Sequence, residues 1–223
     1  MKNNFQFAFK TMLVFIMGFG ITSSFAADQG WNTKSLSLKA NDKLTLALSQ
    51  ESRYQELTYL GSSFLSNVQA GFIYKLPHNL YIGLAYKREH QERSTFTSYD
   101  NRIIVDSGRK SNITGNLNLD TRLRFEFRNY EQPQLEDHMM YRLMFKFSYK
   151  LKLGNLNLSP FIASEPFGDT KDASQQFINR HRLYAGTGVS LMEHVGFVVN
   201  YIRQDLKHSE TLHILSTGIK LSF

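Results

Sequence analysis

Hydrophobic and charged residues alternate along residues 121–128, which read Thr-Arg-Leu-Arg-Phe-Glu-Phe-Arg. With a period of two, Leu123, Phe125 and Phe127 share one face of a strand, and the charged residues share the other face. A half-buried strand of a soluble sheet places its apolar face on the core and its charges in open water. Here the apolar face and the charged face both run through the whole segment. The pattern alone therefore does not decide which face contacts water and which contacts an apolar environment.

Similar alternating segments recur along the chain, and they are separated by polar or turn-forming stretches. We expect strands near residues 44–53, 64–75, 80–89, 121–128, 141–150, 156–165, 180–189, 195–201 and 215–223. Residues 31–40 alternate loosely, and Gly108 and Gly115 make the stretch 102–117 ambiguous. The stretches 53–63, 89–101, 131–138 and 166–174 are polar and are expected to be loops.

Strands of about 9–11 residues with alternating apolar and polar positions are typical of transmembrane barrels. The sequence therefore predicts an all-β fold, a transmembrane antiparallel up-and-down β-barrel of 10–12 strands. A soluble sandwich is the alternative, and it would need a second sheet to cover the apolar faces. Because a purely antiparallel sheet closes only with an even count, we expect ten strands if residues 31–40 stay outside the wall, or twelve if residues 94–117 hide a second strand. Ten strands would leave a filled lumen, and twelve a narrow passage.

The amino terminus has the layout of a secretory signal peptide. Lys2 and Lys10 are followed by an uncharged apolar run at residues 11–21, and small residues at Ser24 and Ala26 precede an expected cleavage before Ala27. The apolar run is short for a membrane span, which disfavours a retained anchor helix. We therefore expect a signal peptide at residues 1–26 and one barrel domain at residues 27–223.

Composition excludes several kinds of site. The chain has no cysteine, so it can form neither disulfides nor thiolate metal sites. Its 26 Lys and Arg residues outnumber 19 Asp and Glu residues, but the two signs are mixed along the chain, which disfavours nucleic acid as a partner. No sequence pattern indicates a cofactor or a metal.

If the apolar faces meet lipid, a set of charged residues and one tyrosine points into the lumen. The expected lumen residues are Glu51, Arg53, Lys87, Glu89, Arg122, Arg124, Glu126, Arg128, Arg142, Lys146, Glu165, Arg180, Arg182 and Tyr184. One interpretation is an ion-pair network that fills a small lumen, since arginine forks match carboxylates. The other is an anion-selective conduit lined by arginine.

Several of these segments carry a resemblance to a known family. The strand R-x-R-x-E-x-R at residues 122–128, and Glu165-Pro166-Phe167 followed by N-R-x-R-x-Y-x-G at residues 179–186, resemble a family of bacterial outer-membrane barrels of unknown function. The resemblance covers nearly the whole chain after the signal peptide, and it implies a barrel in the cell envelope without implying an activity. A looser similarity, in size and basic lumen, is to small porins for acidic oligosaccharides. The final Phe223, after alternating apolar residues, resembles the signal that hands such barrels to their assembly machinery.

Enzyme interpretations find little support in the linear sequence. His208, Ser209 and Glu210 are adjacent, but neighbours on a strand point to opposite faces and cannot form one site. A catalytic site made of His208, His213 and Ser216 is also disfavoured, because His213 is expected to face lipid. A metal cluster of the loop histidines His90, His138 and His208 is disfavoured by their spacing, and no catalytic residue is assigned.

The sequence thus predicts a protein of the bacterial outer membrane. Its expected function is a narrow channel or binding barrel for small anionic solutes, with arginines in the lumen setting selectivity. The alternatives are a closed barrel, plugged by salt bridges, with a structural or adhesive role through its loops, and an outer-membrane hydrolase. Expected partners are membrane lipid, the outer-membrane assembly machinery and small anionic solutes.

Overall fold

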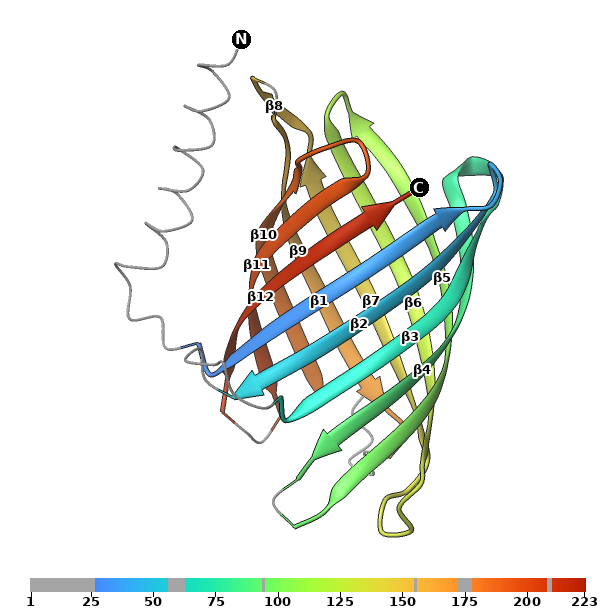
Figure 1. The fold of residues 1–223 in the computed structure, drawn as a ribbon, viewed down its shortest axis with the longest axis vertical. Coiled ribbons are helices and arrows are strands. Elements are labelled where there is room, and N and C mark those ends of the chain that lie inside the picture. Colours follow the sequence, from blue (N-terminus) through green and yellow to red (C-terminus); the bar gives the residue numbers. More distant parts are fainter. Residues whose placement is uncertain (1–26, 56–62, 94, 155, 172–177, 208–209) are drawn as a thin grey trace.

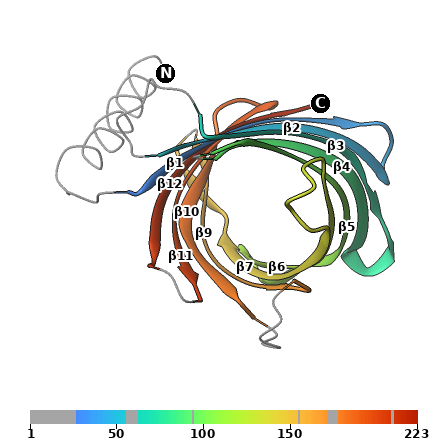
Figure 2. The same cartoon turned by 90° about the horizontal axis from the view of Figure 1, so that it is seen from below.

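The chain folds into a closed β-barrel, seen from the side in Figure 1 and along its axis in Figure 2. The structure is a computed structural model, and it describes residues 27–55, 63–93, 95–154, 156–171, 178–207 and 210–223. The expected signal peptide and the pair His208 and Ser209 lie outside the described residues. Within the described ranges, no helix is long and apolar enough to cross a membrane.

Most of the described chain lies in strands, and one short 3₁₀ turn, η1 (Pro77–Asn79), joins two of them. The strands are β1 (Gln29–Lys39), β2 (Leu44–Gln55), β3 (Leu65–Lys75), β4 (Leu80–Glu92), β5 (Thr97–Thr114), β6 (Leu117–Tyr130), β7 (His138–Tyr149), β8 (Leu151–Leu153), β9 (Leu156–Asp169), β10 (Arg180–Ser190), β11 (Val195–Leu206) and β12 (Leu212–Ser222).

The barrel closes with an odd number of wall positions, which corrects the expectation of ten or twelve. β8 continues β7, because both pair with β9 in one register, so the twelve described strands form eleven positions. Neighbouring wall positions pair in antiparallel fashion, except that β1 pairs with β12 in parallel, with Trp31 beside Ser216. The even-count argument assumed antiparallel pairing throughout, and one parallel pair removes that requirement. Residues 31–40 therefore belong to the wall.

Two predicted loops are also shorter than expected. The stretch 89–101 was expected to be a loop, but β4 extends to Glu92 and β5 begins at Thr97. The expected loop at 166–174 is wrong at its start, because β9 runs through Pro166 to Asp169. β5 spans the ambiguous segment as one strand of 18 residues. These extensions lengthen the wall beyond the apolar band, where polar residues are compatible with strand structure.

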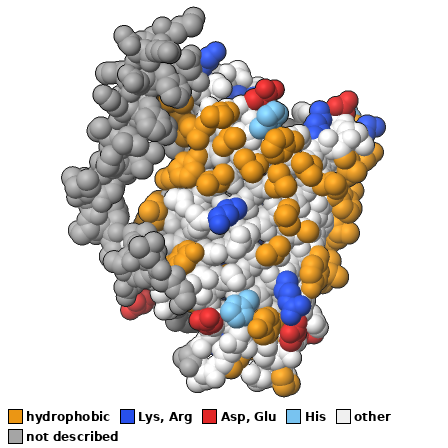
Figure 3. Space-filling view, viewed as in Figure 1, with side chains coloured by type: hydrophobic (Ala, Val, Ile, Leu, Met, Phe, Trp, Pro, Cys, Tyr) orange, Lys and Arg blue, Asp and Glu red, His pale blue; other side chains and the backbone are white. Residues whose placement is uncertain are grey.

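The outer face is hydrophobic, as the alternation predicts. Large apolar side chains are exposed on the wall, including Leu46, Val68, Ile82, Phe127 and Ile162. Figure 3 shows such side chains spread over one face of the wall. A soluble monomer rarely exposes an apolar surface this extensive, whereas a band of this kind matches the hydrocarbon core of a bilayer.

The two ends of the barrel differ. We call the end with Phe223 and the connection Ala40–Lys43 the turn end, and the end with the connection Glu131–Asp137 the loop end. At the turn end, Phe223 donates a backbone hydrogen bond to Ser37 and its ring stacks on His194, with centroids 5.1 Å apart. Exposed tyrosines mark both limits of the apolar face, with Tyr74 and Tyr149 toward the turn end and Tyr86 toward the loop end.

Candidate functional site

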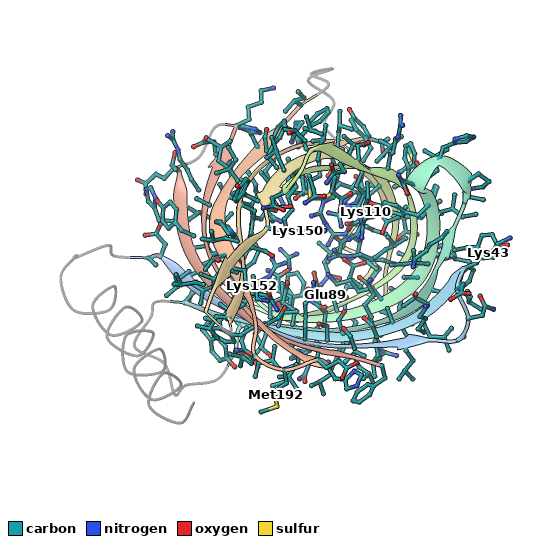
Figure 4. All side chains as sticks on the ribbon, turned by 90° about the horizontal axis from the view of Figure 1, so that it is seen from above. Lys43, Glu89, Lys110, Lys150, Lys152 and Met192 are labelled. Atoms are coloured by element: carbon teal, nitrogen blue, oxygen red, sulfur yellow. The ribbon has the colours of Figure 1, made fainter. Side chains whose placement is uncertain are left out.

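Charged side chains from several strands face the interior of the barrel. Alternation puts Glu51 and Arg53 of β2, the charged residues of β6 and those of β7, β9 and β10 on the inward face, together with Lys87 and Glu89 of β4. Viewed along the axis in Figure 4, Glu89 and Lys110 point into the barrel, while Lys43 and Met192 point away. The lumen is therefore lined by charge over much of its circumference.

The centre of the lumen is a chain of guanidinium and carboxylate groups. Arg142 Nη1 donates to Glu126 Oε1 over 2.7 Å, and Arg142 Nη2 donates to Glu165 Oε2 over 2.9 Å. Arg102 Nη1 donates to Glu126 Oε2 over 3.2 Å, so Glu126 lies between two arginines. Glu126 and Glu165 are each only 1% exposed, which means that other side chains enclose both carboxylates.

This network extends toward the loop end through β4, β5 and β6. Arg102 also bonds to Glu89 and, over 2.7 Å, to Asp100. Arg128 Nε donates to Asp100 Oδ2 over 2.8 Å, and Lys87 Nζ lies 3.3 Å from Glu89 Oε2. Each carboxylate in this branch meets at least one cation, which fits the high cost of burying an unpaired charge.

Toward the turn end, further pairs complete the network. Arg124 makes a bidentate pair with Asp106, at 2.7 and 2.8 Å. Arg122 Nη2 donates to Glu165 Oε1 over 2.9 Å, and the Tyr184 hydroxyl donates to Glu165 Oε2 over 2.6 Å. Charge-assisted bonds of this kind are roughly twice as strong as neutral ones, so the network ties six wall strands together across the lumen.

The other side of the lumen, next to the β1–β12 pair, has a different composition. Arg53, Arg180 and Arg182 surround the rings of Trp31 and Phe167, and we call these five residues the basic recess. Arg53 Cζ lies 4.0 Å from the Trp31 ring centroid, and Arg182 Cζ lies 4.9 Å from Trp31 and 4.6 Å from Phe167. Arg180 Cζ lies 5.8 Å from Phe167. Aromatic faces stabilise these cations by cation–π attraction.

Positive charge exceeds negative charge in the basic recess. Glu51 pairs with Arg53 at 2.7 Å, but among the described residues no carboxylate oxygen lies within 4.0 Å of Arg180 or Arg182. Arg182 Nε donates to the neutral amide of Gln204 over 2.6 Å. In the described part of the chain, Arg180 Nε is buried and has no hydrogen-bond partner, a feature it shares with Arg122 Nε, Glu89 Oε2 and Asp100 Oδ1 of the network. A buried guanidinium donor without an acceptor is costly, so this group is suited to an acceptor from a bound molecule.

Lys146 is the third predicted lumen cation without a carboxylate within 4.0 Å in the described part of the chain. Its Nζ lies 3.9 Å from the Phe161 ring centroid. It sits nearer the turn end, on the same inward face as Asp120 of the adjacent strand. Lumen cations without a carboxylate oxygen within 4.0 Å therefore lie at two depths of the described barrel.

Sequence reasoning missed several members of both groups. Asp100, Arg102 and Asp106 lie on β5, in the stretch that was expected to be partly loop and partly ambiguous. Trp31 was missed because residues 31–40 were the weakest strand candidate, and Phe167 because a loop was expected there. The sequence did contain an indication of β5, because Asp100, Arg102 and Asp106 occupy alternate positions. In the structure these positions lie on one face of β5, beside β6.

The histidines do not form a metal site in the part of the chain that the structure describes. There, no three His, Cys, Asp or Glu side chains meet in an arrangement that could hold a metal ion. His90 packs beside Tyr99, and His138 Nε2 lies 3.3 Å from Asp169.

Comparisons with known proteins agree with this architecture. A family model described as "Protein of unknown function (DUF2490)" matches residues 28–212, and no curated protein matches the chain. The beta domain of the Bordetella autotransporter BrkA is similar in structure, with a TM-score of 0.51, 12% identity and coverage of 81% of this chain and 82% of that one. LpxR from Salmonella typhimurium is similar with a TM-score of 0.53, 9% identity and coverage of 85% and 87%. At these identities the likeness shows a fold of the outer-membrane barrel type.

Proposed function

We propose that this chain, which belongs to the DUF2490 family of proteins of unknown function, is an outer-membrane barrel that binds small anions in its lumen. The basic recess is the binding site, and Arg180 and Arg182 are the principal contacts. The observation that supports this proposal most strongly is the buried Arg180 Nε, which has no hydrogen-bond partner among the described residues, beside a second arginine bonded to a neutral amide.

The position of the basic recess suits capture from outside the cell. Arg180 is the first residue of β10, and Arg53 lies near the end of β2, both at the loop end. In bacterial barrels the short turns face the periplasm and the longer loops face the exterior. With that orientation, an anion enters from the exterior, and the planar guanidinium forks bind phosphate or carboxylate oxygens.

Passage through the barrel is narrow in this proposal. The network around Glu126 and Glu165 occupies the lumen beside the basic recess, and its paired, enclosed side chains narrow the path of anions that leave the recess. Lys146 offers a second attractive position nearer the turn end. The barrel therefore acts first as a binding site, and anions cross it slowly.

Trp31 provides the test, because it is the single tryptophan of the chain and lies against Arg53 and Arg182. We expect inorganic phosphate to change the fluorescence of the folded barrel saturably at low salt. Arg182→Met and Arg180→Met should each weaken binding about tenfold or more, since a hydrogen bond to a charged group contributes about 1.5–3 kcal/mol.

Arg203→Met is the matched control, because Arg203 lies on the outer face and pairs with Asp205. It should leave phosphate binding unchanged. Equal weakening in all three variants, or no saturable response in the wild type, contradicts the proposal. Single-channel recording in a salt gradient separates passage from binding, since small anion-selective steps are expected and a silent bilayer with folded protein would limit the function to binding.

Export and membrane location belong to the same proposal. Residues 1–26 direct export, and the outer membrane receives residues 27–223 as one barrel domain. Mass spectrometry of the protein purified from outer-membrane fractions should show a chain that begins at Ala27. Recovery from the soluble periplasm would contradict this location.

A further inference from the structure

A serine and a histidine form a close pair on the outer face of the barrel, away from the lumen site. Ser164 Oγ of β9 lies 2.9 Å from His181 Nε2 of β10. Glu165 and Arg182 on the same strands point inward, so Ser164 and His181 point outward. Both side chains are partly exposed, and nothing in the proposed anion site uses them.

The pair lies where the apolar face ends. On the side of the pair toward the turn end, the outward residues are Ile162, which is 62% exposed, and Leu183, which is 41% exposed. On the side toward the loop end, Asp205 stands directly opposite His181 in the β10–β11 ladder. In a bilayer this boundary corresponds to the level where acyl chains join the polar part of a lipid.

The surroundings of His181 fit a general base. With its proton on Nδ1, the imidazole accepts the Ser164 hydroxyl hydrogen at Nε2, which is the arrangement that activates a serine. The Asp205 carboxylate, which accepts from Thr211 Oγ1 over 2.8 Å, interacts electrostatically with His181. That negative charge stabilises the imidazolium that forms when the histidine takes a proton.

A positive group accompanies the pair. Arg203 occupies the same cross-strand row as Ser164, with Leu183 between them. Its Nε donates to Asp205 over 3.0 Å, and its side chain is 52% exposed. A guanidinium at this place can attract the phosphate of a lipid headgroup or the oxyanion of a reacting ester.

We propose that Ser164 and His181 form a catalytic pair that hydrolyses a carboxylic ester of a membrane lipid at the outer surface of the barrel. Ser164 Oγ attacks the ester carbonyl carbon while His181 Nε2 takes the hydroxyl proton. The tetrahedral intermediate then expels the alcohol, which receives that proton, and an acyl-serine remains. Water, deprotonated by His181, attacks the acyl-serine, and the fatty acid leaves as Ser164 regains its proton. No redox partner or metal takes part.

The pair was not evident in the linear sequence because it forms across two strands. Ser164 and His181 are 17 residues apart, and they meet because His181 pairs with Pro166, two residues beyond Ser164. The alternation of residues within one strand does not show which residue of the next strand will lie beside them.

The test uses the folded, full-length mature barrel in phosphatidylcholine vesicles. A fluorophosphonate with a long alkyl chain is the probe, and peptide mass spectrometry locates the labelled residue. We expect labelling of Ser164, its loss in Ser164→Ala, and at least a tenfold slower rate in His181→Gln. Release of fatty acid from the vesicle lipid should fall in parallel.

Ser107→Ala is the matched control, because Ser107 also faces outward, on β5 between Ile82 and Leu123, as Ser164 does between Phe145 and Leu183, but no histidine lies within two residues of its ladder partners. This variant should keep full labelling and hydrolysis. A folded wild-type barrel whose Ser164 is labelled no faster than Ser107 would overturn the proposal. Undiminished fatty-acid release by Ser164→Ala would do the same.

Discussion

Removing Arg142 tests whether the lumen network is enclosed by protein or bathed in water. Arg142 reaches Glu126 at 2.7 Å and Glu165 at 2.9 Å, and its Cζ lies 4.5 Å from the Phe167 ring centroid. The variant Arg142→Met keeps a long apolar stem but leaves both carboxylates with one cation fewer.

The expected loss of stability follows from the burial of those two carboxylates. Breaking a buried ion pair by removing one partner costs about 3–5 kcal/mol, because the remaining charge stays desolvated. Here Glu126 keeps Arg102 at 3.2 Å and Glu165 keeps Arg122 at 2.9 Å. Since each carboxylate keeps one cation, we expect the free energy of unfolding to fall by about 3 kcal/mol, the lower end of that range.

The assay is equilibrium unfolding in urea with the barrel in lipid vesicles, followed by the fluorescence of Trp31. Arg203→Met is the control with the same chemical change, because its pair with Asp205 at 3.0 Å is 52% and 36% exposed. An exposed pair contributes about 0–1 kcal/mol, so the control should unfold almost like the wild type.

A second change checks the cause of the loss. Adding Glu165→Gln to Arg142→Met removes one of the two stranded charges, so part of the lost free energy should return. If Arg142→Met costs no more than Arg203→Met, the network is hydrated, and the description of an enclosed, narrow lumen is wrong.

Three further predictions address the wall. The variant Thr33→Cys with Gly218→Cys should form a disulfide on mild oxidation, because a Cβ at Gly218 would lie 3.8 Å from Thr33 Cβ, and free thiols in the folded barrel would contradict the parallel β1–β12 pair. Lys34→Leu should stabilise the barrel in lipid by up to about 2–4 kcal/mol, since Lys34 faces outward midway along β1; an unchanged urea midpoint would show that the lysine does not face hydrocarbon. Gly168→Ala should destabilise by about 1–3 kcal/mol, because the new methyl group would lie 2.0 Å from Tyr141 Cζ; unchanged unfolding would show that this tyrosine packs elsewhere.

The alternation of apolar and polar residues was sufficient to predict the barrel. Leu123, Phe125 and Phe127 face outward and their charged neighbours inward, because lipid and lumen select opposite residue types at every second position. The strand limits were less predictable. Beyond the apolar band, β4, β5 and β9 continue with residues that are polar on both faces. No apolar–polar alternation marks a strand there, so residues 89–101 and Pro166 were assigned to loops.

Alternation predicts on which face of a strand each arginine lies, but it does not predict the ion pairs that the arginines form. Arg102 and Glu126 are 24 residues apart, and they meet only through the register of β5 against β6. Which arginine lacks a carboxylate depends on the whole set of cross-strand neighbours around the closed ring. The same holds for closure itself, because nothing within residues 29–39 encodes the parallel partner that β12 provides.

The anion site is tested most directly by anomalous diffraction from crystals of the folded barrel soaked in tungstate, a phosphate-like oxyanion. We expect a peak in the lumen whose oxygens lie about 3 Å from the guanidinium groups of Arg180 and Arg182, with Arg180 Nε donating to one of them. A lumen without such a peak, in which Arg180 Nε instead donates to a carboxylate of the protein, would contradict anion binding in the basic recess.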